Sequence, residues 1–143
     1  MNKLFLLPMT IFLIILSACT NHPGTPVEPN ENNMIITIKN NANFDFYGLE
    51  TAILNHSPGM INADGSKIAK GEELRFEFLK DDFELDGEAD MEVRIITVIH
   101  KDDNSKRIRI NKKMPLQLAN NQELFFELTG DSIQKAELRR VNN

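Results

Sequence analysis

Cysteine, tryptophan and tyrosine are scarce in this chain, and it has no excess of positive charge. The 143 residues include one cysteine, one tyrosine and no tryptophan. A single cysteine excludes an intrachain disulfide framework and any zinc site built from several cysteines. The 16 Lys and Arg residues are outnumbered by 21 Asp and Glu, which gives a net charge of −5. Because sequence-independent nucleic-acid binding depends on cations that neutralise phosphates, we expect no nucleic-acid partner.

The motifs of common catalytic and nucleotide-binding sites are absent as well. The sequence contains no G-x-S-x-G, no H-E-x-x-H and no glycine-rich phosphate loop. His56 stands beside Ser57, but neighbours in sequence rarely face each other productively. A glycosidase-type carboxylate pair cannot be picked out of so many acidic residues. We therefore predict a protein that is not an enzyme and has no cofactor. A hydrolase with an unidentified carboxylate pair is the second alternative.

Long apolar runs are confined to the start of the chain. Thirteen of the first 18 residues are apolar, against 46 of the 125 from Cys19 onward. Lys3 precedes an apolar stretch over residues 4–16 that only Pro8 and Thr10 interrupt. That length suits the apolar region of a signal peptide and falls short of the ~20 residues that a membrane-spanning helix needs. We predict a signal peptide over residues 1–18.

The end of this stretch, Leu16-Ser17-Ala18-Cys19, resembles the lipobox of bacterial lipoproteins. In that class the signal peptide is cleaved before the cysteine, here between Ala18 and Cys19, and the cysteine thiol carries a diacylglycerol. The resemblance implies a membrane-anchored protein whose folded part lies on the extracytoplasmic face of the cell membrane. In a cell with two membranes it implies the outer one, because Thr20 and not Asp follows the cysteine. An ordinary secretory signal that holds a cysteine near its cleavage site is the alternative.

A proline-rich spacer follows the cysteine. Residues 20–33 contain three prolines, one glycine and a single apolar residue, Val27. Such a composition cannot bury a core. We predict a tether over residues 19–33, whose 14 residues after Cys19 reach roughly 40 Å at ~3.1 Å per residue, and a folded domain over residues 34–143.

The domain reads as a series of short strands separated by turn residues. The clearest run, residues 73–78, alternates so that Leu74, Phe76 and Phe78 point inward and the charges point outward. Residues 55–66 are expected to form a loop or paired turns, and a helix rivals a strand over residues 132–140. Strands are expected over residues 34–39, 44–54, 73–78, 91–99, 107–110, 114–118, 123–129 and 133–141.

This spacing predicts an all-β domain, namely a small antiparallel β-sandwich of immunoglobulin-like architecture with seven to eight strands. A small β-barrel is the alternative. The Cys…Trp…Cys signature of true immunoglobulin domains is missing, because the chain has no tryptophan.

Acidic residues gather in the middle of the chain. Residues 72–92 hold ten carboxylates and two basic residues, a local net charge of −8. Within them, Asp82, Glu84 and Asp86 precede Gly87 in the order that opens a calcium-binding loop, but the twelfth position is Val93 where a bidentate Glu is needed. We favour a solvated face, and keep a calcium-dependent surface module using these three carboxylates as the alternative function.

Basic residues gather later, with a net charge of +4 over residues 101–113. Arg107 and Arg109 flank the inward-facing Ile108, so both lie on one exposed face. They could meet anionic lipid headgroups or wall polymers. Pairing with neighbouring acidic strands is the alternative, and we favour it.

Together these features predict a lipid-anchored, extracytoplasmic binding or accessory protein of the bacterial envelope. Its membrane contact is the lipid on Cys19, and its partner is expected to be an envelope protein met through a strand edge or a loop tip. The oligomeric state does not follow from the sequence.

Overall fold

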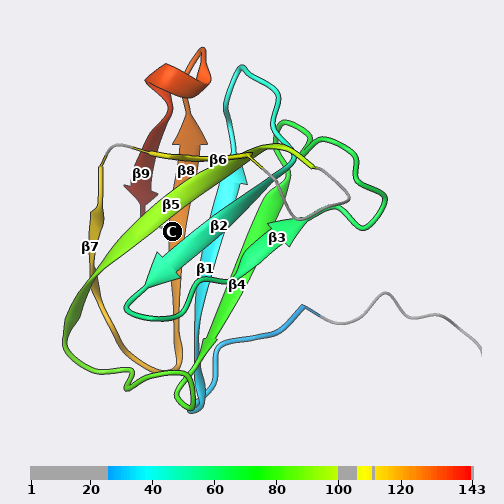
Figure 1. Ribbon diagram of the computed structural model, residues 1–143. Coiled ribbons are helices and arrows are strands. Elements are labelled where there is room, and N and C mark those ends of the chain that lie inside the picture. The colour runs from blue at the N-terminus through cyan, green and yellow to red at the C-terminus, as the bar shows by residue number, and fades with distance from the viewer. Residues whose placement is uncertain (1–25, 100–105, 111, 143) are drawn as a thin grey trace, which may run out of the picture.

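The computed structural model describes residues 26–99, 106–110 and 112–142. Within these ranges the chain forms nine strands and one short 3-10 turn (Figure 1). The elements, in chain order, are β1 (Asn33–Asn40), β2 (Gly48–Ile53), β3 (Gly59–Ile61), β4 (Glu73–Leu79), β5 (Glu88–Val98), β6 (Lys106–Arg109), β7 (Met114–Gln117), β8 (Gln122–Thr129), η1 (Ile133–Lys135) and β9 (Glu137–Val141). The predicted signal peptide and the residues Ala18 and Cys19 lie outside the described residues.

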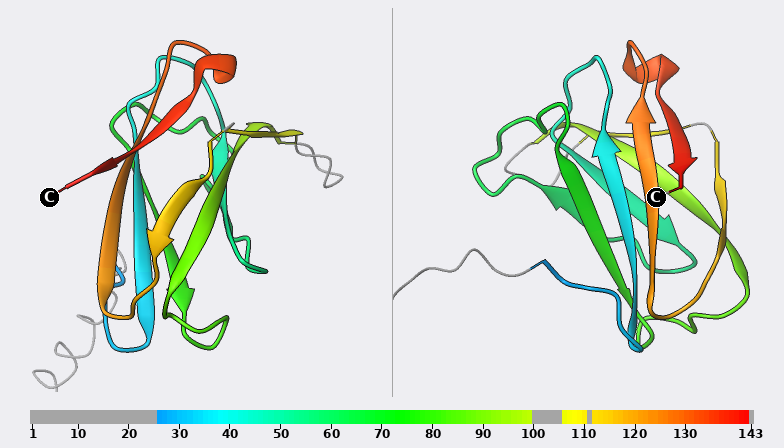
Figure 2. Two further views of the ribbon diagram at one scale, coloured as in Figure 1. Left: turned by 90° about the vertical axis from the view of Figure 1, so that its left-hand side faces the viewer. Right: turned by 180° about the vertical axis from the view of Figure 1, so that it is seen from behind.

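The strands form two sheets that pack face to face, which Figure 2 (left) shows nearly edge-on. Sheet A has the order β4-β1-β8-β9; β1 runs parallel to β8, and the other pairs are antiparallel. Sheet B has the order β3-β2-β5-β6, and β7 pairs with the first half of β5 beside β6. The all-β, sandwich-like prediction is confirmed. The prediction of a purely antiparallel sandwich is wrong, because β1 lies between β4 and β8 and runs parallel to β8. The alternative of a closed barrel is wrong, because among the described residues no ladder joins the two sheets at either side.

Alternating apolar side chains from both sheets fill the space between them. Leu74, Phe76 and Phe78 of β4 are at most 2% exposed, as the alternation predicted. Val93 and Ile95 of β5 meet them from sheet B. Full burial of one such side chain stabilises the fold by about 1.5–3 kcal/mol, so this core is the main source of stability.

The strand boundaries differ from the prediction where a loop carries core residues. The strand expected over 44–54 begins only at Gly48, and Phe46 in the preceding loop is fully buried at the end of the core. The expected loop over 55–66 contains the three-residue β3, which brings the strand count to nine instead of seven to eight. Gly48 permits this pairing, because a Cβ there would lie 2.2 Å from the carbonyl oxygen of Met60.

The C-terminal segment combines both rival predictions. Residues 133–135 form the 3-10 turn η1, and only residues 137–141 form a strand. Gly130 makes this turn possible, because its φ is +126° and a Cβ there would lie 2.4 Å from the carbonyl oxygen of Lys135. The strand around Pro115 pairs only with β5 among the described elements, consistent with the edge position that proline favours.

The last residues assigned to the tether are part of the fold. The backbone N–H of Asn30 donates to the Asn33 side chain (2.8 Å), and the Asn33 amide donates to Glu77 of β4 (2.7 Å). The N–H of Asn121 donates to the carbonyl of Asn30 (2.8 Å). Residues 28–33 therefore form a hydrogen-bonded turn against sheet A and belong to the folded domain.

Candidate functional site

The predicted arginine pair lies on the outer face of sheet B. Arg107 Nε donates to Glu50 Oε2 at 2.7 Å, and Arg109 forms an ion pair with Glu92, with Nε 2.9 Å from Oε1. Arg94 joins the two acids, at 2.5 Å to Glu50 and 2.8 Å to Glu92. Both glutamate side chains are nearly buried, at 11% and 12% exposed. Hydrogen bonds from Arg94 to Glu50 and then Glu92 raise the pKa of Arg94 above its ordinary value.

This network ties three neighbouring strands together. Glu50 lies in β2, Glu92 and Arg94 in β5, and Arg107 and Arg109 in β6. The shared face of the two arginines was predictable from their spacing, and their pairing with acidic neighbours is the alternative that the sequence favoured. Their use as contacts for an anionic surface stays a prediction, and it requires competition with carboxylates already in place.

The acidic residues proposed as calcium ligands lie in the loop between β4 and β5. Asp82 Oδ2 accepts the N–H of Leu79 at 3.0 Å, and Asp86 Oδ1 accepts the N–H of Gly87 at 2.8 Å. Glu84 is exposed. Among the described residues, no group of three or more His, Cys, Asp or Glu side chains is close enough to hold a metal ion. A metal role for these carboxylates stays a prediction.

The same loop is held down by its apolar residues. Phe83 and Leu85 pack against the core, so the alternation of apolar and acidic residues holds although the segment is not a strand. His56 packs edge-on against Phe78, with ring centroids 5.8 Å apart, and its Nε2 lies 3.5 Å from Asp82 Oδ2. Sequence reasoning missed the contact between His56 and Asp82, because β3 and β4 separate these two residues in the chain.

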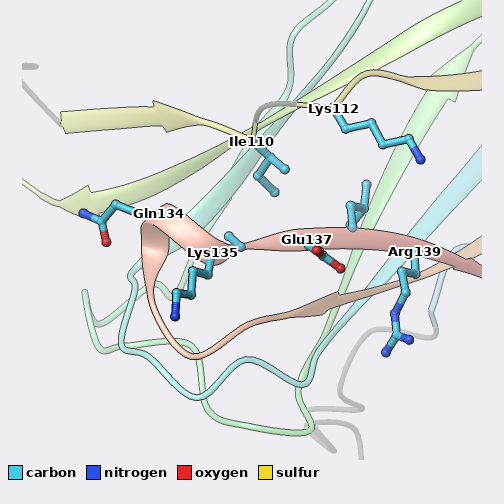
Figure 3. Close-up of a pocket in the computed structure, with 8 residues that line it drawn as sticks. Ile110, Lys112, Gln134, Lys135, Glu137 and Arg139 are labelled. Carbon is cyan, nitrogen blue, oxygen red and sulfur yellow. The ribbon is translucent and has the colours of Figure 1, made fainter.

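A groove of about 600 Å³ lies beside β9, between that strand and the residues that follow β6. We name it the β9 groove; its lining residues are Ile110, Lys112, Gln134, Lys135, Ala136, Glu137, Leu138 and Arg139. Ile110 and Leu138 form an apolar floor, since they are only 4% and 6% exposed. Figure 3 shows Ile110 and Lys112 on one side of β9, and Lys135 and Arg139 directed to the other side.

Three residues that line the groove are cations without an ion-pair partner among the described residues, namely Lys112, Lys135 and Arg139. Arg140, which follows Arg139 but does not line the groove, likewise forms no ion pair with a described residue. Elsewhere, Arg75 pairs with Glu123 at 3.2 Å, and the three arginines of sheet B are paired as described above. Sequence reasoning missed this cluster, because it combines the segment after β6 with the C-terminal strand.

Two further observations concern membrane-spanning helices and similarity to known proteins. The described part of the chain contains no helix that is long and apolar enough to cross a membrane. No protein family model, no curated protein and no solved structure matches this chain. Its function is therefore argued from its own residues.

Proposed function

We propose that this chain is a lipid-anchored, extracytoplasmic binding protein of the bacterial envelope that acts without catalysis. The observation that carries the proposal is the position of the only cysteine, directly after a signal-type apolar stretch and two small residues. Two or more acyl chains on that cysteine and its amino group would anchor the protein stably, whereas a single chain gives marginal, reversible binding.

The fold supports display close to a membrane. Because residues 28–33 belong to the domain, at most residues 20–27 separate Cys19 from the fold. At ~3.1 Å per residue, these eight residues reach roughly 25 Å. The domain would then work within one domain diameter of the lipid surface, where its partners would be other envelope components.

The surface supports binding more than catalysis. The β9 groove is open, with an apolar floor and a basic rim, and its lining residues include no histidine, serine or carboxylate pair arranged for proton transfer. The calcium-dependent module and the hydrolase remain alternatives, and for the calcium module the acidic loop supplies the candidate ligands Asp82, Glu84 and Asp86. The immunoglobulin-like architecture is likewise proposed, on the basis of two packed sheets of about the expected size.

Intact mass and detergent partitioning of the full chain, expressed in a bacterial host, test the anchor. We expect a chain that starts at Cys19, carries a lipid-sized mass increment and enters the detergent phase. A Cys19→Ser variant should lose both properties, whereas Thr20→Ser, which changes the neighbouring residue but keeps the motif, should retain them. A soluble chain without lipid would refute the anchor and leave a freely secreted domain.

Crosslinking in cells then tests the binding role. Proteins crosslinked to the anchored chain should depend on the folded surface, so unfolding the domain by placing a charge in the core, as in Phe78→Asp, should abolish the crosslinks. Crosslinks that persist in the unfolded variant would contradict a specific binding role.

A further inference from the structure

The free edge of β9 can accept another strand. The N–H of Asn41 donates to the carbonyl of Leu128 at 2.8 Å, so the peptide groups of Leu128 face β1 and not β9. Leu138 lies opposite Leu128 in the β8–β9 ladder and is therefore in a non-hydrogen-bonded pair. By the same alternation, the N–H and C=O groups of Leu138 and Arg140 point away from β8, toward the open side of sheet A.

The two faces of this edge differ in chemistry. On the inner face, Leu138 and Ile110 offer an apolar surface at the floor of the β9 groove. On the outer face, Lys135 and Arg139 stand on either side of Glu137 (Figure 3). An added strand would place alternate side chains on these two faces, so apolar residues would enter the groove and acidic residues would lie beside the cations.

Charge disfavours a second copy of this chain as the occupant. Two β9 strands paired edge to edge would bring Arg139 and Arg140 of one copy near the same residues of the other. Like charges across a strand pair are destabilising, and basic residues on an edge are a common protection against such pairing. The cations without carboxylate partners instead complement an acidic segment.

We propose that the free edge of β9 binds an extended segment of a partner protein, with alternating apolar and acidic residues, as an additional strand of sheet A. The inference rests on the binding role proposed above and names the chemistry of the partner. It does not depend on the lipid, because every residue it uses lies in the folded domain.

A labelled peptide, Ser-Glu-Val-Glu-Leu-Glu-Val-Ser, tests the proposal by fluorescence anisotropy with the full-length protein in detergent. We expect saturable binding that weakens with salt, and no comparable binding of the same peptide with Lys in place of Glu. Reversing both outer-face cations in Lys135→Glu/Arg139→Glu should weaken binding roughly tenfold, because two attractive ion pairs with the peptide are replaced by repulsion. Lys70→Glu/Lys80→Glu, the same double charge change in the exposed loops before and after β4, is the matched control and should bind as the parent does.

A second pair of variants isolates the backbone. Arg140→Ala removes only the side chain, whereas Arg140→Pro also removes the N–H that points to the free edge and leaves the β8–β9 hydrogen bonds in place. Arg140→Pro should bind the peptide at least fivefold more weakly than Arg140→Ala, with both variants retaining the cooperative unfolding of the parent. Equal affinities of the folded variants would overturn strand addition, as would equal binding of the Lys peptide.

Two controls separate this proposal from its alternatives. Dimerisation on light scattering that Arg140→Pro abolishes would assign the edge to a second copy and overturn the peptide proposal. The Cys19→Ser chain should bind the peptide with unchanged affinity. Peptide binding by a parent chain that is found to carry no lipid would therefore overturn the anchor alone, and a lipidated parent chain that does not bind the peptide would overturn the β9 inference alone.

Discussion

Replacing Glu50 with glutamine tests whether the charge network on sheet B stabilises the fold. Glu50 is 8% exposed and accepts hydrogen bonds from Arg94 and Arg107 through its two carboxylate oxygens. Glu50→Gln keeps the size of the side chain and removes its charge. Both hydrogen bonds then change from charged pairs to neutral-acceptor bonds or are lost.

The expected loss in free energy of unfolding depends on how far the arginine partners of Glu50 are exposed to solvent. Hydrogen bonds to charged groups contribute about 1.5–3 kcal/mol each, and neutral ones about 0.5–1.5 kcal/mol, so two exchanges would cost about 2–3 kcal/mol in a buried site. The arginine side chains are 33% and 37% exposed, so solvent screens the pairs. We therefore expect Glu50→Gln to lower the free energy of unfolding by about 1–2 kcal/mol.

Urea unfolding measures this change as a lower midpoint with an unchanged slope. Glu88→Gln, an exposed glutamate in β5, is the control and should shift the free energy of unfolding by less than about 0.5 kcal/mol. A double-mutant cycle with Arg107→Gln should show a coupling energy between Glu50 and Arg107. A Glu50→Gln midpoint equal to that of Glu88→Gln, or no coupling in the cycle, would refute the stabilising role.

Two substitutions and one titration test other parts of the fold. Gly48→Ala places a Cβ against the Met60 carbonyl and should cost about 1–3 kcal/mol in urea unfolding, with amide exchange in β3 accelerated; normal protection there would contradict the close approach. Phe78→Ala, at a fully buried position, should cost about 3–5 kcal/mol, and a loss below 1 kcal/mol would show that the core is not packed as described. Hydrogen bonds from Ser66 lower the pKa of Asp64 below its ordinary 3.8, so its stabilising effect is present above that pH and is lost as the pH falls through the lowered value. A carboxyl titration by NMR checks this, and a pKa at or above 3.8 would contradict the turn geometry.

Local alternation was sufficient to predict much of the architecture. Residues 73–78 alternate in charge and apolarity, and the structure buries the apolar set that this pattern selects. The pairing of Arg107 and Arg109 with acids also followed from local charge, because like-facing cations on a strand need neighbours of opposite sign. Both predictions depend on residues two positions apart, which is the scale on which strand geometry operates.

The sequence did not predict contacts between residues that are far apart in the chain. The sequence analysis assigns residues 28–33 to the tether, because a polar turn and a polar linker have the same kind of composition. What distinguishes it is Glu77, 44 residues from Asn33, and Asn121, about twice as far along the chain. The floor of the β9 groove is likewise formed by Ile110, directly after β6, and Leu138 of β9. No local sequence pattern predicts that these two residues lie together.

The parallel pairing of β1 with β8 sets the order in which the chain can fold. Each edge of β1 pairs with seven residues of a neighbour, β4 on one side and β8 on the other. Met34 pairs with Gln122, so the centre of sheet A is complete only when nearly the whole chain is present. Pairing over such separations is slow, and unpaired strand edges aggregate. A chain that crosses a membrane from its N-terminus could therefore pair β1 with β4 on one edge, but the other edge of β1 would stay open until β8 arrives, a period in which a holding chaperone would matter most.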